Sequence, residues 1–423
     1  MIVMISKIKK ILYFPLAYYF RFFAKIQLAI WKPTVIVVTG SSGKTTLLNL
    51  IESQLQEKAK YSHFANSSYG ISFNILGLSR KKLTLDEWFY LFLLAPFKAF
   101  KTPPKEKIYV VEADADRPKE GKFLASLLKP SITLWVSASR THTMNFDYLV
   151  KNNGFSSVDE AIAHEFGYFL QYTSNLAILN GDSDLITKQI SRTKASIKYV
   201  TKKELNNYKV FKDHTEFVIN SKDYSINALL PKETSYSIQM TLALLEFLKI
   251  KPDYSFSKFT LPPGRCSLFK GIKNTTIIDS SYNVTPAGLR SILEMFDLYP
   301  SDKKWLVLGD MIELGNEEQE EHEKLAAVIN SMKLDKIILV GPRLLKYTYP
   351  KLNPPAGGAE KFTMPKDALN YLLSHLRGGE AVLFKGARFL EGVIEHLLLN
   401  KNDVKKLCRR EKVWQERRKK WGL

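Results

Sequence analysis

The sequence predicts an α/β protein with two domains. One is a central P-loop ATPase domain on a mostly parallel sheet, and the other is a carboxyl-terminal, Rossmann-like α/β domain. Two observations support this prediction. From residue 34 onward, apolar strand-like segments alternate with helix-like ones, as in parallel sheets covered by helices. A glycine-rich turn follows the first of these strands. With 423 residues, 45% of them hydrophobic, the chain can form more than one core.

The elements of the first half follow from this alternation. Short β-branched runs predict strands, and longer segments with helical spacing of apolar residues predict helices. We expect strands at residues 35–39, 108–112 and 132–136, and helices at residues 45–56, 119–128 and 237–248.

The second half repeats the pattern after a segment with three prolines, residues 249–263, which we interpret as a linker. The predicted organisation has four parts: residues 1–33, a central domain 34–255, a carboxyl-terminal domain 256–400 and a basic tail 401–423. We expect the strands of the second domain at residues 276–279, 305–308, 336–340 and 381–384.

The most informative segment is VIVVTGSSGKTT, residues 35–46. A glycine after a buried strand lets the backbone approach an anion, and the helix that follows points free N–H groups at it. Lys44 adds a positive charge and Thr45 a hydroxyl for Mg²⁺. Only two residues separate the glycines, so the loop is a short variant of the G-x-x-x-x-G-K-[ST] pattern. A tight turn before a helix is the plainer alternative. The predicted phosphate-binding residues are Gly40, Ser41, Ser42, Gly43, Lys44, Thr45 and Thr46.

Acidic residues follow the strand predicted at residues 108–112. Ligands of open parallel sheets bind at the carboxyl ends of strands, so Glu112 is expected beside the phosphate loop, where Mg²⁺ needs oxygen ligands. Asp114 lies close enough to contribute, whereas Asp116 is better explained as a cap of the next helix. His142 follows the neighbouring strand, on a loop where a metal or phosphate contact competes with simple solvation.

Composition narrows the partners. The net charge is +20, and thirteen of these charges are terminal, because residues 1–32 hold six basic and no acidic residues and residues 401–423 hold ten basic and three acidic ones. We interpret both termini as attracted to an acidic surface, with anionic lipid ahead of nucleic acid. Two cysteines cannot form a disulfide framework, so we expect a cytoplasmic protein. The basic termini add the expectation that it is peripheral on the inner membrane face.

Residues 11–31 are apolar and aromatic but contain Pro15, Arg21 and Lys25. Since a spanning helix needs roughly 20 consecutive apolar residues, this segment is expected to lie on a membrane rather than cross it. Packing on the protein's own core is the alternative. For the tail, a solvated basic helix is the simplest interpretation, and contact with lipid or nucleic acid is the functional alternative.

Further motifs occur along the chain in a fixed order. They are GSSGKTT at 40–46, NSSYGI from Asn66, Glu112 with Arg117 and Pro118, His142, NGD at 180–182, Gly264 with Arg265, DSSYNVTP at 279–286, LGDMIELG at 308–315 with His322, and KGAR at 385–388. On these motifs the chain resembles the Mur ligase family over roughly residues 33–400, and its second half resembles the branch that adds D-alanyl-D-alanine to UDP-muramoyl tripeptide.

The resemblance implies that ATP activates a carboxylate as an acyl phosphate, which an amine then attacks to form an amide. It implies ATP and Mg²⁺ as cofactors and assigns residues to roles by position. Catalysis falls to Lys44, Glu112 and His142. Mg²⁺ binding falls to Thr45, Glu112 and His142, further ATP contacts to Arg265, Asp279 and Asn283, and substrate contacts to Asn66, Lys385 and Arg388.

Three departures from the family pattern stand out. About thirty residues precede the loop strand, so we do not expect a UDP-binding domain, and a lipid-linked or shorter substrate, the membrane segment or a partner is expected to compensate. Phe166 stands where such ligases usually carry a carbamylated lysine, and we hypothesise that Glu165 supplies the lost charge to a second metal ion. Ser280 replaces an acid expected at the nucleotide.

The leading functional prediction is an ATP-dependent amide ligase of peptidoglycan precursor synthesis. It would join a carboxylate to an amino acid or a dipeptide such as D-alanyl-D-alanine. One alternative is a MurT-type subunit that amidates a lipid-linked precursor with a glutaminase partner, although two cysteines cannot build the four-cysteine ribbon common in that type. Others are a degenerate, ATP-binding, membrane-docked scaffold and a basic nucleic-acid-binding NTPase, the last supported by little beyond net charge.

Overall fold

The computed structural model describes residues 2–63, 65–80, 84–141, 143–152 and 154–423, with side chains from residue 13 onward except that of residue 85. The chain divides into two compact units. The first comprises residues 1–138, 152–201 and 240–251, and the second comprises residues 139–151, 202–239 and 252–423. The mixed α/β class predicted from sequence is confirmed.

The first unit is built on a six-stranded sheet in the order β2-β3-β1-β4-β5-β6, with every neighbouring pair parallel. Val35 to Val38 of β1 are buried, which explains the continuous apolar run of a strand covered on both faces. The strands are β1 (Thr34–Thr39), β2 (Ala59–Tyr61), β3 (Ile108–Ala113), β4 (Ile132–Trp135), β5 (Leu176–Asn180) and β6 (Ser196–Val200).

Helices surround this sheet, and the three that the sequence predicts agree with the structure within one to three residues. Lys44–Leu55, Glu120–Leu128 and Thr234–Leu248 correspond to the three predicted helices. The set is α2 (Lys44–Leu55), α3 (Ser68–Leu76), α4 (Leu85–Ala99), α5 (Glu120–Leu128), α7 (Val158–Gln171), α8 (Asp184–Thr187) and α9 (Thr234–Leu248).

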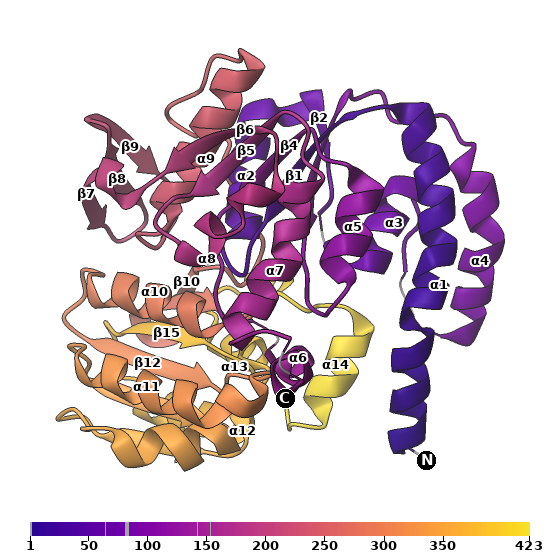
Figure 1. Ribbon diagram of the computed structural model, residues 1–423. Helices are drawn as coiled ribbons and strands as arrows, with labels where there is room; N and C mark the ends of the chain where they lie inside the picture. The colour runs from indigo at the N-terminus through magenta and orange to yellow at the C-terminus, as the bar shows by residue number, and fades with distance from the viewer. Residues whose placement is uncertain (1, 64, 81–83, 142, 153) are drawn as a thin grey trace. The chain divides into compact units, whose positions relative to one another are not determined.

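Helix α1 (Ile2–Trp31) packs lengthwise on α3 and α4, and Figure 1 shows it beside them. Phe20 is fully buried on this face, with its ring 4.8 Å from that of Phe92. Tyr19 donates its hydroxyl hydrogen to the Phe92 carbonyl at 2.8 Å. Core packing therefore accounts for one face of the segment, and Tyr18 and Phe22 on the other face are exposed.

No helix in the part of the chain that the structure describes combines the length and the apolar character needed to cross a membrane.

The second unit contains a sheet in the order β10-β11-β15-β12-β13-β14, in which β10 is antiparallel to β11 and the other pairs are parallel. The four strands predicted here are confirmed within a residue. The strands are β10 (Ser267–Gly271), β11 (Thr275–Ser280), β12 (Lys304–Gly309), β13 (Lys336–Val340), β14 (Ala359–Phe362) and β15 (Ala381–Lys385).

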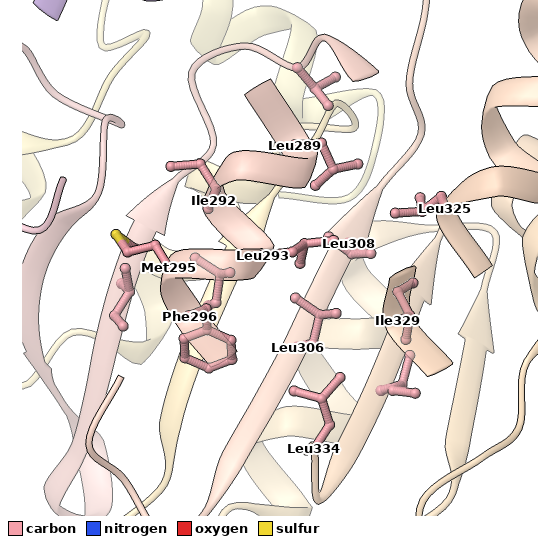
Figure 2. Close-up of a cluster of buried hydrophobic side chains, with 14 of the residues drawn as sticks. Leu289, Ile292, Leu293, Met295, Phe296, Leu306, Leu308, Leu325, Ile329 and Leu334 are labelled. Carbon is pink, nitrogen blue, oxygen red and sulfur yellow. The ribbon is translucent and has the colours of Figure 1, made fainter. Parts of the chain in front are cut away.

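Helices cover both faces of this sheet. Figure 2 shows one face, where Leu293 and Phe296 of α10 and Ile329 of α11 meet Leu306 and Leu308 of β12. Alternate strand residues point to opposite faces, so Val307 joins the core under α12 and α13 instead. The helices are α6 (Asp147–Lys151), α10 (Pro286–Asp297), α11 (Glu318–Asn330), α12 (Pro365–His375), α13 (Leu390–Leu397) and α14 (Lys412–Lys419).

A small antiparallel sheet in the second unit was not predicted. Its strands, β7 (Leu205–Val210), β8 (Thr215–Ile219) and β9 (Lys222–Ile226), lie in the order β7-β8-β9. Phe217 and Ile219 of β8 are buried, whereas much of β7 and β9 is exposed. Short, polar strands of this kind give a weak sequence signal.

The basic tail differs from the solvated helix expected. Arg418 of α14 is only 5% exposed and donates to the Arg409 carbonyl at 2.7 Å. The Arg409 guanidinium lies 3.4 Å from the buried carboxylate of Glu391. The expectation of a fully solvated tail is therefore wrong for these two arginines, because a buried acid requires nearby cations.

Candidate functional site

The phosphate loop is held open by two glycines and one serine. Gly40 and Gly43 have φ of +134° and +80°, and a Cβ on Gly40 would come within 2.7 Å of the Ser137 carbonyl oxygen. The backbone N–H of Ser41 donates to that oxygen at 3.1 Å, and that of Ser42 donates to Ser137 Oγ at 2.9 Å. Gly43 offers no capping side chain to α2, so the start of this helix suits an anion.

Lys44 is buried at the start of α2 and held from two sides. Its Nζ donates to the Gly40 carbonyl at 2.6 Å and lies 2.8 Å from Asp114 Oδ2. Burial lowers the pKa of Lys44, but the carboxylates of Asp114 and Glu112 more than offset this, so the net shift is upward. Lys44 is therefore a fixed cation. Asn66 lies beside this pair, since its carbonyl accepts from the Asp114 N–H at 2.9 Å.

Glu112 and Thr45 meet at the carboxyl end of the sheet. The Thr45 hydroxyl lies 2.9 Å from Glu112 Oε2 and 3.1 Å from Oε1. Strands β1 and β3 are paired in register at Val38 and Glu112, which brings the acid to the loop as predicted. The Ser62 hydroxyl accepts from the Glu112 N–H at 2.9 Å and fixes the strand end. Two hard oxygen donors thus converge beside a phosphate loop.

The remaining predicted metal ligands are His142 and Glu165, and His142 lies outside the described residues. Among the described residues, no group of three or more His, Cys, Asp or Glu side chains gathers in a way that could hold a metal ion. Mg²⁺ is commonly held by one or two protein oxygens with phosphate and water completing its shell, so the Thr45 and Glu112 pair fits such an ion.

Glu165 belongs to α7, is 6% exposed, and its carboxylate reaches the start of α5. Its oxygens accept from the backbone N–H groups of Lys119 at 2.8 Å and Gly121 at 3.0 Å, so it caps that helix. Burial raises the pKa of Glu165, against the lowering by these hydrogen bonds. Phe166 points into the core, with its ring 6.1 Å from that of Trp135. An apolar side chain has therefore replaced the expected lysine.

The second unit brings together Asp279, Asn283 and Lys385. Lys385 is buried and donates from Nζ to the Asn283 carbonyl at 2.6 Å. Asp279 is also buried. Its Oδ1 accepts from the N–H and hydroxyl of Ser281 at 2.9 and 2.6 Å, and its Oδ2 has no hydrogen-bond partner in the part of the chain that the structure describes. Burial raises the pKa of Asp279 and lowers that of Lys385 to about 8. The Arg265 guanidinium lies over the ring of Tyr282 at 4.9 Å, and its positive charge adds to the lowering of the pKa of Lys385.

Arg388, predicted to contact substrate, is engaged within its own unit. Its Nη2 lies 2.6 Å and its Nε 3.0 Å from Oδ2 of Asp310, which is fully buried. The other oxygen of Asp310 accepts from the N–H groups of Arg343 and Leu344 at 3.1 and 3.0 Å. Asp310 of the LGDMIELG motif is therefore the anchor of a polar cluster that fixes the direction of Arg388.

The imidazole ring of His322 contacts backbone groups of the same motif and of the helix that follows it. The Met311 N–H donates to Nε2 at 3.3 Å, and Nδ1 lies 2.7 Å from the Glu318 carbonyl. These contacts require a neutral ring with its proton on Nδ1. Burial lowers the pKa of His322, which agrees with this state. For this histidine the structural role is the one the geometry supports.

Lys385 gives the second unit a testable pH response. Its pKa falls from the ordinary 10.5 to about 8, so between these values the unfolded chain binds a proton that the folded chain has lost. Stability therefore rises with pH from about 8. The thiols of Cys266 and Cys408, with pKa raised to about 11 and about 12 by burial, oppose this above about pH 9.

We expect the free energy of unfolding of the full chain to rise between pH 8 and 9. In Lys385→Met this rise should disappear, and stability at pH 7 should increase by about 2–3 kcal/mol. Urea denaturation at several pH values checks this. An equal slope in the variant and the parent would contradict the assignment of the slope to Lys385.

Sequence reasoning missed two residues of the first-unit site and the main contact of a third. Asp114 was named as an acid near the metal, but its main contact is Lys44. Ser137 and Ser62 were not named, although each binds the end of a neighbouring strand or the loop. A serine just after a buried strand is a signal only once the strand order is known, because that order brings β4 beside β1.

Comparison with known families agrees with this geometry. Residues 38–243 match the Mur ligase middle domain, and residues 264–388 match the Mur ligase glutamate ligase domain. The chain belongs to the Mur ligase family. The family predicted from sequence is confirmed, and with it the enzyme class of ATP-dependent ligases.

Two relatives of this Mur ligase share the same name. The UDP-N-acetylmuramoyl-tripeptide–D-alanyl-D-alanine ligase of Rickettsia prowazekii is 24% identical over 378 residues, which cover 84% of this chain and 76% of that protein. The ligase of the same name from Bacillus subtilis is 24% identical over 383 residues, covering 86% and 76%.

Solved structures share the fold. The MurF ligase of Thermotoga maritima, crystallised with ADP, superposes with a TM-score of 0.71 at 22% identity, covering 92% of this chain and 84% of that one. MurF of Acinetobacter baumannii gives a TM-score of 0.70 at 18% identity, covering 90% and 79%.

Proposed function

We propose that this Mur ligase is an ATP-dependent amide ligase of peptidoglycan precursor synthesis that joins D-alanyl-D-alanine to a muramoyl tripeptide. The name shared by its relatives supports the substrates. The single observation that carries the reaction class is the convergence of Lys44, Thr45 and Glu112 at the phosphate loop. This is the constellation that phosphoryl transfer requires.

The chemistry follows from these side chains. A substrate carboxylate oxygen attacks the γ-phosphorus of ATP, ADP leaves, and the amine then displaces phosphate from the acyl carbon. Loop N–H groups and Lys44 neutralise the phosphate charges, and most of the rate comes from this and from positioning. Lys44 already lies close to the loop carbonyl of Gly40, so little side-chain movement is needed to reach a bound phosphate.

Mg²⁺ would be held by Thr45 and Glu112, with His142 as the third predicted ligand. When bound, the ion would neutralise phosphate charge. The carboxylate and hydroxyl that it needs already lie within hydrogen-bonding distance of each other.

Glu165 extends this proposal as the source of charge near a second metal ion, in place of the absent lysine. Because it also caps α5, we expect Glu165→Gln to destabilise the protein by about 1–2 kcal/mol. We also expect it to raise the Mg²⁺ concentration needed for half-maximal activity. Thermal unfolding and Mg²⁺ titration of phosphate release separate the two effects. A lower melting temperature with unchanged Mg²⁺ dependence would leave Glu165 as a cap alone.

The second unit is proposed to contribute nucleotide and substrate contacts. Arg265, Asp279 and Asn283 are assigned to ATP, and Lys385 and Arg388 to the substrate, together with Asn66 of the first unit. The buried, hydrogen-bonded state of Lys385 and the fixed direction of Arg388 support this assignment, because preorganised cations bind carboxylates at lower entropic cost.

We further propose that basic residues near both termini attract the protein to the anionic inner face of a membrane from the cytoplasm. The six basic and no acidic residues of the first 32 positions support this. In the tail, pairing of Arg409 with Glu391 removes part of the available charge, so the amino-terminal side is the stronger candidate.

The test is phosphate release from ATP and Mg²⁺ with UDP-muramoyl tripeptide and D-alanyl-D-alanine, supplied together and separately. We expect release only with both, accompanied by the mass of a new amide. Measurable ATP binding without release in any combination would contradict these substrates, and the same assay with lipid-linked acceptors would then follow.

A further inference from the structure

Helix α4 exposes a row of large apolar side chains. Phe89, Tyr90, Leu93, Phe97 and Phe100, the last at the end of the helix, are 53–77% exposed. Spacings of three and four residues place them on one face. Such an apolar row is more than the scattered exposure usual on a soluble protein, and it marks an interaction site.

The exposed row is not part of the core of the first unit. The opposite face of α4 already packs inward, where Leu91 is 2% exposed and Ala95 and Ala99 are fully buried. Trp88 and Phe92 also turn inward, with their rings 6.1 and 4.8 Å from that of Phe20 on α1. Both the buried and the exposed face of α4 are therefore apolar.

Helix α1 extends the exposed row. Tyr18 and Phe22 are 55% and 60% exposed. Consecutive ring contacts of 5.2, 5.0 and 4.8 Å link Phe22 through Phe23 and Tyr19 to Phe92 of α4. Phe22 is thus joined to α4 through this aromatic contact, whereas the ring of Tyr18 lies 4.9 Å from that of Phe123 on α5. We call the following exposed side chains the α1–α4 aromatic surface: Phe22, Phe89, Tyr90, Leu93, Phe97 and Phe100.

The charges around the carboxyl-terminal part of this surface, from Leu93 to Phe100, are positive. Residues 88–105 contain three lysines and no acid, and the chain contains no acid before Glu52. Lys25, Lys101 and Lys105 are exposed. The acids on α4 itself, Asp86 and Glu87, lie in its first turn.

Aromatic rings edged by lysines match the headgroup boundary of an anionic bilayer. A second copy of the chain would place two positively charged surfaces against each other.

We propose that the α1–α4 aromatic surface docks on an anionic lipid bilayer, with its rings at the headgroup boundary and its lysines against lipid phosphates. This deepens the proposed membrane attraction and rests on it for the charge of the lipid. It differs in assigning the apolar contact mainly to α4, whereas the sequence pointed to residues 1–33 and the tail.

The experiment is flotation of the full chain with vesicles of phosphatidylcholine alone or with 30% phosphatidylglycerol. We expect the parent to float with the anionic vesicles and less at high salt. The double variant Phe97→Ser, Phe100→Ser should bind about tenfold more weakly or worse. The matched control, Leu298→Ser, Leu399→Ser, removes two leucines that are 56% and 60% exposed in the second unit, and it should bind like the parent.

Each other result overturns the proposal in a distinguishable way. If the aromatic variant floats like the parent, the surface is wrong while the charge attraction of the termini stands. If the parent floats with neither vesicle type, both membrane proposals fail, and self-association at the same concentration, measured by analytical ultracentrifugation, would assign the surface to a second copy. The melting temperature of each variant shows whether the fold is intact, and phosphate release shows whether the ligase site is intact. A failure of the ligase proposal can therefore be distinguished from a failure of the membrane proposal.

Discussion

Replacement of Lys44 by methionine is expected to lower the rate of ATP-dependent ligation by about a thousandfold or more. Methionine keeps the length and apolar stem of the side chain but removes the charge at Nζ, which lies 2.6 Å from the Gly40 carbonyl. In phosphoryl transfer the protein mainly neutralises and positions charge, so no neighbouring group compensates. The measurement is phosphate release at saturating ATP with both substrates present.

The same change has a structural cost that must be separated from the catalytic one. Lys44→Met leaves the carboxylate of Asp114, 6% exposed, without its cation, at a cost of about 3–5 kcal/mol. The double variant Lys44→Met, Asp114→Asn removes both charges and should recover much of this stability. We expect it to remain inactive. Recovery of ligation to within about tenfold of the parent would mean that Lys44 matters only for folding.

The fold was predictable where one physical rule dominates. The buried strands at residues 132–136 and 336–340 are mostly apolar, each with four apolar residues of five, because helices cover both faces of a parallel sheet. The sheet β7-β8-β9 was missed because its strands are short and carry many polar residues, and those of β7 and β9 are partly exposed. Helix α4 was not predicted either, since apolar residues on both of its faces give no clear helical period.

The site was predictable to the extent that it is local in sequence. The loop from Gly40 to Thr46 predicts phosphate binding, and the strand end at Glu112 predicts a Mg²⁺ ligand, each from a few consecutive residues. The contacts between such segments depend on strand order, and this order places Asp114 on Lys44. Arg388 shows the same limit, because its partner Asp310 lies 78 positions away and only β12 beside β15 explains their meeting.

The second large effect is expected from Glu112→Gln. Glutamine keeps the shape of the side chain, and its amide oxygen can still accept a hydrogen bond from the Thr45 hydroxyl, whose oxygen lies 2.9 Å from Glu112 Oε2. The fold should therefore be unchanged. It removes the negative charge proposed for Mg²⁺. We expect the Mg²⁺ concentration for half-maximal phosphate release to rise about a hundredfold or more, since changes even behind a metal ligand cost 10- to about 100-fold.

Glu57→Gln is the matched control, because Glu57 is an exposed acid of the same unit and its loss should leave the Mg²⁺ titration unchanged. A readout without turnover strengthens the test. Mg²⁺ with ADP should raise the melting temperature of the parent by mass action, and Glu112→Gln should lose most of the part that depends on Mg²⁺. If that increment is preserved while ligation falls, Glu112 acts on the substrate rather than on the metal, and the convergence of Thr45 and Glu112 would then serve only to position the loop.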